Sequence, residues 1–260
     1  LLNAGSFLLG PVIGASLYAI FPMSIVLMSD VAGAILASIA LAVVKIPKLE
    51  KAEQEEQHFI AEIKEGLQVF KEDKNLFYIV VAEALCMFFY APLSSFYPLM
   101  TSDYFKLSAM YGSAVELSFA AGMMASSLLF SSVLKINQKI RVSFIGLFGM
   151  GVMSLICGII PPTYVGWFFF AGSCICLGAS GNVHTIPLTA YMQETISPDR
   201  MGRAFSVLTL ISSVTMPIGL LFSSPIAEKV GVNVWFFISG LCMIILTACV
   251  SIRYSTKCRR

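Results

Sequence analysis

Acidic side chains within apolar stretches are the part of this sequence most able to do chemistry. Glu83 and Glu116 each lie inside a run of hydrophobic residues, and His184 lies in a third run, shortly before Pro187. A charge at the centre of a bilayer costs about 2.5–3.5 kcal/mol, so such residues face protein or water. Because burial favours the neutral form of a carboxyl group, it can take up and release a proton there. These residues are therefore candidates for a proton or cation pathway.

Glu83 shares a predicted helical face with polar and aromatic side chains. Counting on from it at helical spacing places Tyr90, Ser94 and Tyr97 on the same side. A stripe of this kind is suited to lining a cavity for an amphiphilic ligand. The alternative is that Glu83 is hydrogen-bonded to a neighbouring segment and only holds the helices together.

The other candidates also have competing structural explanations. Gly112 and Ala120 share a predicted face with Glu116. Because small residues let helices approach closely, a buried structural hydrogen bond competes with a functional role for this carboxyl group. Asn182 and His184 lie close together, and polar side chains in membrane helices often hydrogen-bond to a neighbouring helix. Both alternatives stay open at this point.

The elements that position these residues are long apolar segments. The chain is 57% hydrophobic and 12% charged, with a mean hydropathy of +0.83. A helix needs about 20 apolar residues to cross a bilayer, whereas a spanning strand needs only about 10 residues of alternating polarity. The lengths and the lack of alternation predict helices, which satisfy their own backbone hydrogen bonds in lipid. The predicted segments are residues 1–20, 23–45, 76–100, 109–134, 142–160, 164–193, 204–227 and 232–252.

One long hydrophilic stretch, residues 46–75, separates two apolar segments from the six that follow. Within it, Phe59, Ile63, Leu67 and Phe70 recur at helical spacing, with charges between them. This pattern is typical of a helix that lies on a membrane surface with its apolar face in the lipid. A plain solvated connector is the alternative.

Lysine and arginine residues gather on one side of this predicted topology. With an even number of spans, the hydrophilic stretch, the loops at 135–141 and 194–203 and the C-terminal tail share one side. That side holds 15 of the 17 basic residues, and only Lys106 and Lys229 fall on the other. The positive-inside rule assigns the basic side to the cytoplasm. Both ends of the chain are then expected to be cytoplasmic.

Several classes of function lack support in the sequence. No basic patch alternates with aromatic residues, so we expect no nucleic-acid partner. Six of the seven cysteines lie inside apolar runs without metal-ligand spacing, which favours packing residues over disulfides, a metal site or a bound cofactor. The chain has two histidines, no His-Glu-x-x-His motif and no nucleophile elbow. We therefore expect no catalytic residues and no enzyme activity.

Three stretches of the chain resemble the major facilitator superfamily, from its fifth helix to its twelfth. SFLLGPVIGA is similar to the antiporter motif of the fifth helix: Gly10, Pro11 and Gly14 match, whereas Ser6 and Ala15 replace the outer glycines. IKEGLQVFKEDKNLFYIV is similar to the entry into the seventh helix in the macrolide-efflux branch. MQETISPDRMGRAFSV is similar to that branch's loop between helices ten and eleven. The superfamily's Gly-x-x-x-Asp-Arg-x-Gly-Arg-Arg loop is only vestigial in SSVLKINQKIR, where the acidic residue is absent.

The resemblance implies an all-α integral membrane protein with a major-facilitator-type helix bundle. About eight transmembrane helices are then present and the N-terminal four are missing. Residues 1–45 correspond to the last two helices of the N-terminal bundle, 46–75 to a cytoplasmic amphipathic linker, and 76–260 to the six-helix C-terminal bundle with a basic tail. A Pro-Gly bend like that of residues 10–14 recurs at Pro217, as expected for parallel repeats.

We therefore expect part of a secondary active transporter of the cell (inner) membrane. The expected activity is proton-coupled efflux of an amphiphilic small molecule, such as a macrolide-like drug, by a monomer that works by alternating access. The alternatives are an exporter of another metabolite such as a siderophore, a non-transporting membrane scaffold, and a membrane-embedded enzyme. On this interpretation the 260 residues alone do not transport, because two helices cannot form the N-terminal bundle.

The expected substrate or proton pathway comprises Glu83, Tyr90, Ser94, Tyr97, Glu116, Asn182 and His184, and the expected conformational motif comprises Gly10, Pro11, Gly14 and Pro217.

The charge distribution predicts which loops are reachable from outside the cell. In a cysteine-free background, single cysteines at Asp103, Thr163 and Glu228 should react with a membrane-impermeant thiol reagent added to intact cells. Cysteines at Glu55 and Lys139 should react only after the membrane is opened. The reverse labelling pattern would overturn the topology.

Overall fold

Helices make up all the regular structure in the residues that the computed structural model describes, namely 21, 23–43, 59–132 and 138–258. Seven helices in these ranges are long and apolar enough to cross a membrane, judged by length and composition. They are α2 (Met23–Val43), α4 (Lys74–Leu99) with its continuation η1 (Met100–Tyr104), α5 (Ala109–Ser132), α6 (Lys139–Ile159), α7 (Tyr164–Thr195), α8 (Pro198–Val230) and α9 (Val232–Cys258). The shorter α3 (Phe59–Glu72) lies in the hydrophilic stretch. The prediction of an all-α membrane protein is confirmed, and the first predicted segment, residues 1–20, lies outside the described residues.

Several helices extend beyond the apolar segments from which they were predicted. The loop expected at 194–203 is in fact short, because α7 continues to Thr195 and α8 begins at Pro198 with Ser197 as its N-cap. Proline is favourable at this position, where its missing N–H has no intrahelical partner to lose. The basic tail is also helical as far as Cys258. Hydropathy marks only the apolar part of a helix, whereas the backbone hydrogen bonds continue into its polar ends.

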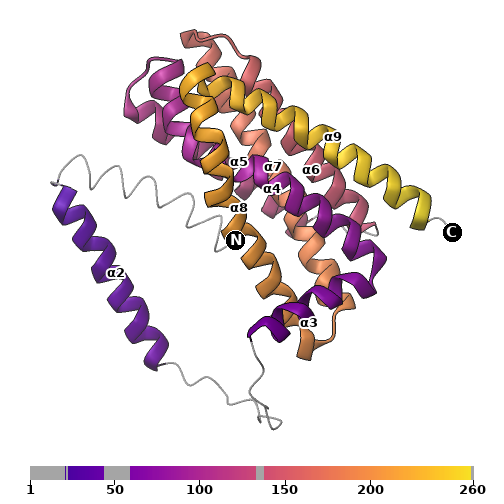
Figure 1. Ribbon diagram of the computed structural model, residues 1–260. Coiled ribbons are helices and arrows are strands. Elements are labelled where there is room, and N and C mark those ends of the chain that lie inside the picture. Colours follow the sequence, from indigo (N-terminus) through magenta and orange to yellow (C-terminus); the bar gives the residue numbers. More distant parts are fainter. Residues whose placement is uncertain (1–20, 22, 44–58, 133–137, 259–260) are drawn as a thin grey trace.

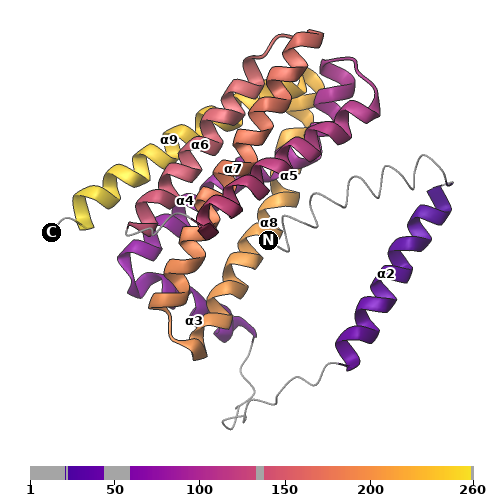
Figure 2. The ribbon, with the colours of Figure 1, turned by 180° about the vertical axis from the view of Figure 1, so that it is seen from behind.

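The helices α4 to α9 form one bundle, and α2 stands apart from it in both views (Figures 1 and 2). At the centre of the bundle, α6 packs along both α7 and α9. The outer helix α5 packs on α7, while α4 lies against α9 and α8. The short α3 packs on the first turns of α8. The candidate residues on α4 and α7 are thus held around the central helix α6.

Close approach of the helix backbones at small residues makes this packing possible. A Cβ atom built on Gly146 of α6 would lie 2.3 Å from the backbone nitrogen of His184 in α7. On the other side of α6, a Cβ atom on Gly240 of α9 would lie 2.2 Å from the backbone nitrogen of Leu155. Between membrane helices, van der Waals packing of this kind replaces the hydrophobic force that acts in water. The glycines therefore fix how near α7 and α9 come to α6.

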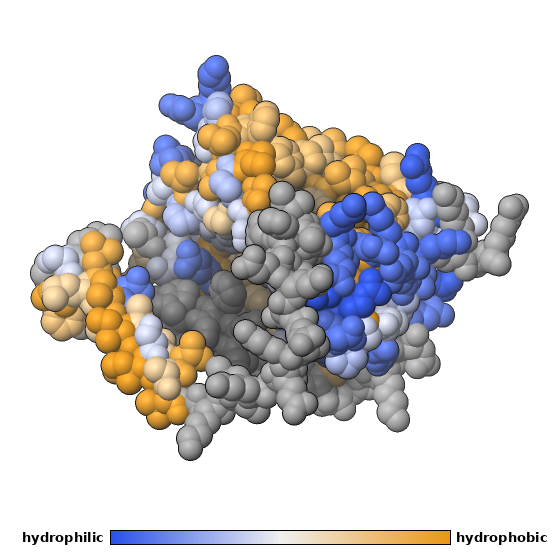
Figure 3. Space-filling view, turned by 60° about the horizontal axis from the view of Figure 1, so that its bottom comes forward, coloured by the Kyte–Doolittle hydropathy of each residue, from blue (hydrophilic) through white to orange (hydrophobic). Residues whose placement is uncertain are grey.

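Charged residues lie at the two ends of the bundle. Asp103 and Glu228 line a hollow of about 480 Å³ at one end. Lys106 lies three residues after Asp103, and Lys229 directly follows Glu228. Hydrophilic residues also gather at the end of the molecule that carries α3 (Figure 3). The basic side chains at that end include Lys64, Lys71, Lys74, Lys139, Arg141, Arg200 and Arg203. This grouping is the one that an alternating, even-span topology predicts.

The contact at Gly146 predicts an asymmetry between two glycine-to-alanine substitutions. Gly146→Ala should destabilise the protein by about 1–3 kcal/mol, because the new methyl group overpacks the α6–α7 contact. Gly172→Ala is the matched control, since a Cβ atom there meets nothing within 4 Å. It should be neutral or stabilising by about 0.5–1 kcal/mol, as expected when alanine replaces glycine in a helix. Thermal unfolding of the purified chain in detergent measures both, and equal midpoints would contradict the packing.

Candidate functional site

Glu83 of α4 and His184 of α7 face each other inside the bundle. The Oε1 atom of Glu83 lies 3.8 Å from Nε2 of His184. The side chain of His184 is 1% exposed and that of Glu83 is 16% exposed. The sequence singled out each residue separately, and the structure brings the two together from helices that are about 100 residues apart in the chain. This pair is the most buried of the acid–base contacts among the described residues.

Ser143 of α6 holds the other side of the His184 ring. Its Oγ lies 2.7 Å from Nδ1 of His184 and donates a hydrogen bond of 3.0 Å to the backbone carbonyl of His184. The carbonyl oxygen of Ser143 is 3.2 Å from the same Nδ1. Sequence reasoning missed Ser143. The one available signal was its place one turn before Gly146 on the buried face of α6, where a small polar residue can contact a neighbouring helix.

Glu83 is held differently, because its own helix packs mainly on α9 and α8. One turn further along α4, the thiol of Cys86 lies 3.4 Å from Oγ1 of Thr247 in α9. The carboxylate of Glu83 extends toward α7, and its Oε2 atom is buried without a hydrogen-bond partner among the described residues. The same holds for Nε2 of His184. Two unsatisfied polar atoms therefore lie close together at the centre of the site.

The rest of the predicted stripe on α4 is divided by its depth of burial. Tyr97 is only 5% exposed, and its ring centre lies 5.9–6.4 Å from those of Phe119, Phe170 and Phe236. It therefore belongs to the aromatic core. Tyr90 is partly buried between the two core clusters of the bundle, whereas Ser94 is exposed and donates a hydrogen bond to the carbonyl of Ala91. Three residues predicted to share one face of α4 thus lie in three different environments: Tyr97 in the aromatic core, Tyr90 at the edge of the core and Ser94 at the surface.

Asn182 connects α7 to α5. Its Nδ2 donates hydrogen bonds to the carbonyl of Met123, at 2.6 Å, and to Oγ of Ser127, at 2.8 Å. Both donor hydrogens of the amide group are thereby used, so the packing explanation is favoured for Asn182. Its neighbour His184 points to α6 instead, so these two residues, close in sequence, do not act on one spot.

Glu116 is half-buried on α5 and makes no hydrogen bond or ion pair within the described part of the chain. Gly112, one turn earlier, lies near Pro98 of α4, where a Cβ atom would be 3.9 Å from the Cα atom of Pro98. Of the predicted conformational motif, Pro217 lies exposed within α8. Gly10, Pro11 and Gly14 lie outside the described residues.

Comparison with known proteins decides the family. The family model described as Major Facilitator Superfamily matches residues 1–220. The chain belongs to the major facilitator superfamily. It is 36% identical over 244 residues to Macrolide efflux protein A of Streptococcus pyogenes, which covers 94% of this chain and 60% of that protein. It is 34% identical over 220 residues to Macrolide efflux protein A of Enterococcus faecalis, which covers 84% of this chain and 68% of that protein.

The major facilitator superfamily is a family of membrane transporters and not of enzymes, and it is the family that the sequence predicted. The chain spans about 60% of the length of the Streptococcus pyogenes relative. Within the described residues, no group of three or more histidine, cysteine, aspartate or glutamate side chains is placed to hold a metal ion. A carboxyl group that faces an imidazole, as Glu83 faces His184, is a pair of groups that can bind a proton.

The linker helix α3 of this superfamily member packs on protein. Val69 and Phe70 are 5% and 3% exposed, and a Cβ atom on Gly66 would lie 2.6 Å from Cγ2 of Val207 in α8. Leu67 is exposed. The amphipathic pattern was correct, but Phe70, one of the apolar residues expected to meet lipid, lies in a core cluster with residues of α4 and α8. The part of the linker before Phe59 lies outside the described residues.

Two ion pairs flank this apolar contact between α3 and α8. Arg200 donates hydrogen bonds of 2.7 and 3.2 Å to the two carboxylate oxygens of Glu72, and Arg203 pairs with Glu65. The sequence suggested only that these arginines anchor the cytoplasmic side of the membrane. The Arg200 guanidinium, chiefly through its hydrogen bonds, holds the pKa of Glu72 below its ordinary value of 4.5. These contacts fix the linker helix to α8.

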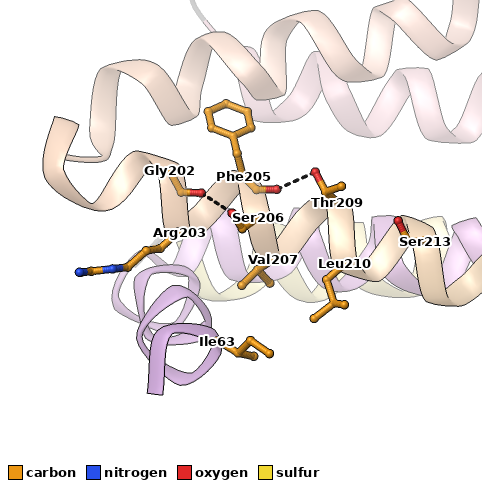
Figure 4. A pocket seen from close by; sticks show the side chains of 9 residues that line it. All are labelled: Ile63, Gly202, Arg203, Phe205, Ser206, Val207, Thr209, Leu210 and Ser213. Atoms are coloured by element: carbon orange, nitrogen blue, oxygen red, sulfur yellow. Dashed lines mark hydrogen bonds between the residues drawn. The ribbon is translucent and has the colours of Figure 1, made fainter. Parts of the chain in front are cut away.

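A hollow of about 500 Å³ opens beside the same contact (Figure 4). Val207 and Leu210 of α8 project toward Ile63 of α3 along its wall. The hydroxyl groups of Ser206 and Thr209 donate hydrogen bonds to carbonyls one turn earlier in α8. Neither Glu83 nor His184 lines this hollow, so it is separate from the buried pair.

The Glu72–Arg200 pair predicts an acid-sensitive attachment of the linker. A carboxylate with a lowered pKa contributes stability above its unfolded value, and this contribution is lost as the pH falls through the folded pKa, here below 4.5. The protection factors of the α3 amides, which correct for the pH dependence of intrinsic hydrogen exchange, should therefore fall in that acidic range. Glu72→Arg and Arg200→Glu should each accelerate exchange at neutral pH, and the double variant should restore protection. If the double variant does not restore protection of the α3 amides, the Glu72–Arg200 ion pair does not hold α3 on α8.

Proposed function

We propose that this chain forms part of a secondary exporter that moves an amphiphilic small molecule out of the cell in exchange for protons. Membership of the superfamily supports transport, and the names of the two relatives support efflux and a macrolide-like compound as the substrate. Alternating access is the mechanism that we assign to it, with one helix bundle rocking against the other. Residues 1–45 belong to the first bundle, 46–75 to the linker and 76–260 to the second.

The observation that carries proton coupling is the largely buried carboxylate of Glu83. A charge at this depth is costly unless it is compensated, and no lysine or arginine is paired with it among the described residues. Protonation removes that cost, and so does a bound cation. A carboxylate that must be neutral in one state and can be ionised in another couples proton uptake to a change of state.

The pathway for the substrate runs along the surfaces of α4, α5 and α8 that remain uncovered. Glu116 and Ser94 are accessible on these surfaces, and Tyr90 is partly so. The α8 helix combines exposed apolar residues with hydroxyl groups along its length. A surface of mixed apolar and weakly polar character suits a ligand that is itself amphiphilic. The transporter acts as a monomer in the cell membrane, and its basic end, with both ends of this chain, faces the cytoplasm.

Substituting Glu83 tests the coupling role in the complete transporter. Glu83→Gln keeps the shape and the hydrogen-bonding groups but cannot titrate. We expect it to abolish efflux of a radiolabelled macrolide driven by a proton gradient, while the amount of protein in the membrane and its thermal stability stay near wild type. Uptake into inverted membrane vesicles with an imposed pH gradient is the measurement.

Glu116→Gln is the matched control on the neighbouring helix. Because Glu116 has no partner among the described residues and lies beside a small-residue contact, its loss should reduce transport much less. A variant Glu83→Gln that pumps at the wild-type rate would refute coupling at this residue. Absence of gradient-driven transport in the wild-type protein would instead refute the proposed function as a whole.

A further inference from the structure

We propose that Glu83 and His184 form one proton-binding site, in which Ser143 holds the histidine in the tautomer that presents a bare Nε2 to the carboxylate. In this arrangement His184 is a functional partner of Glu83, and Ser143 is a positioning residue. The role of the site in transport rests on the proposed function, whereas proton sharing is a property of the pair itself.

The contacts of Nδ1 determine the tautomer. A backbone carbonyl can only accept hydrogen bonds, and the carbonyl of Ser143 lies 3.2 Å from Nδ1 of His184. The hydroxyl hydrogen of Ser143 is directed to the carbonyl of His184 at 3.0 Å, so its Oγ, 2.7 Å from Nδ1, is left to accept. Two acceptors around Nδ1 require that this nitrogen carries the hydrogen. In a neutral imidazole, Nε2 is then unprotonated.

The other side of the ring therefore has two acceptors and no donor. The bare Nε2 faces Oε1 of Glu83 at 3.8 Å, which is beyond the 2.7–3.2 Å range of a hydrogen bond. Both Nε2 and Oε2 of Glu83 lack hydrogen-bond partners among the described residues. A single proton between the two groups turns this repulsive contact into an attractive one. It also changes the net charge of the pair from −1 to zero, which the low dielectric of the interior favours.

No basic side chain competes for this position within the described residues. On the same helix as Glu83, the thiol of Cys86 contacts Thr247. On α6, Lys139 pairs with Glu194 and Arg141 donates to Gln138, all near the polar end of the bundle. Lys74 lies at the first residue of α4, at the polar end of the bundle. The remaining titratable side chains described on the helices around the site are Tyr78, Tyr90 and Tyr97 on α4, Tyr111 and Glu116 on α5, Cys157 on α6, Tyr164, Cys174, Cys176 and Tyr191 on α7, Cys242, Cys249, Arg253 and Tyr254 on α9, and Asp199, Arg200, Arg203, Glu228 and Lys229 near the ends of α8.

Proton binding at this site acts on the attachment of α4 to α7. The only other polar side-chain connection between these helices in the described residues lies at the basic end, where Asn75 donates to the hydroxyl of Tyr191 and Tyr191 donates to Asp73. The protonated pair adds a second connection deep in the bundle, and loss of the proton releases it. The site is therefore placed to convert proton occupancy into a change in the position of α4.

The tautomer can be measured on the purified 260-residue chain in lipid nanodiscs. The sequence contains two histidines, so His58→Gln leaves His184 as the only one. Labelling with ¹⁵N-histidine then gives one pair of ring resonances. Above the pH at which the pair binds its proton, we expect Nδ1 to show the chemical shift of a protonated nitrogen and Nε2 that of an unprotonated one. On acidification, the Nε2 signal and the infrared carboxyl band of Glu83 should change together. A neutral wild-type ring that carries its one hydrogen on Nε2 at the alkaline end of the titration would overturn the proposal.

Three variants separate the proposed site from simple packing. Glu83→Gln should remove the pH step that Nε2 shows in the parent, because the amide can donate to Nε2 at any pH. Ser143→Ala should raise the fraction of the Nε2-protonated tautomer, which a purely structural role of Ser143 would not change. Glu116→Gln is the control and should leave the His184 titration as in the parent. If His184 titrates identically in Glu83→Gln and in the parent, the shared site is overturned, and the outcome of the efflux measurements does not change that.

Transport measurements on the same variants keep the two proposals distinct. The expected outcome is loss of both the linked titration and the gradient-driven efflux in Glu83→Gln. If the titration is linked but Glu83→Gln still pumps, the proton site stands and coupling at Glu83 fails. If efflux is lost without any link between Glu83 and His184, coupling stands and the shared site fails.

Discussion

Close backbone contact between α6 and its two neighbours is the constraint on which the rest of the bundle depends. Where helices are surrounded by lipid, there is no hydrophobic force to drive them together, and association relies on van der Waals fit and hydrogen bonds. Gly146 and Gly240 allow that fit, with α7 on one side of α6 and α9 on the other. The same approach brings Ser143 within hydrogen-bond distance of His184. The packing of the core and the geometry of the candidate site therefore have one origin.

Much of the fold could be predicted from sequence, because the bilayer imposes a length and a polarity on each spanning helix. The order of the helices and the gathering of basic residues at one end follow from these two rules. The ends of the helices could not be predicted as well, since α8 includes six residues, Pro198 to Arg203, that hydropathy assigned to a loop. Nor does amphipathicity reveal which surface covers an apolar face: Val69 and Phe70 of α3 are buried in a core cluster of the bundle.

The candidate site was predictable residue by residue but not as an arrangement. Glu83 and His184 were conspicuous because ionisable groups are rare at membrane depth. Their pairing depends on the relative rotation of α4 and α7, which is set by contacts of α4 with α9 and of α7 with α6. Ser143 carried only a weak signal, its place one turn before Gly146, since a serine in an apolar helix is common. Asn182 shows the opposite case. Like His184, it is a polar residue in an apolar segment, but it lies two residues earlier on α7 and therefore on another side of the helix. It contacts α5 there, in a packing role.

The length of α8 gives the linker a mechanical role. At 1.5 Å per residue, its 33 residues span about 50 Å, whereas the hydrocarbon core of a bilayer is about 30 Å thick. The helix must therefore tilt or project well beyond the membrane, and its basic first turns, Arg200 and Arg203, are the projecting part. Because α3 is fixed to these turns, a small change in the tilt of α8 is magnified at the linker. A helix of this length, attached to α3 at one end, would serve as a lever arm between the membrane interior and residues 59–72.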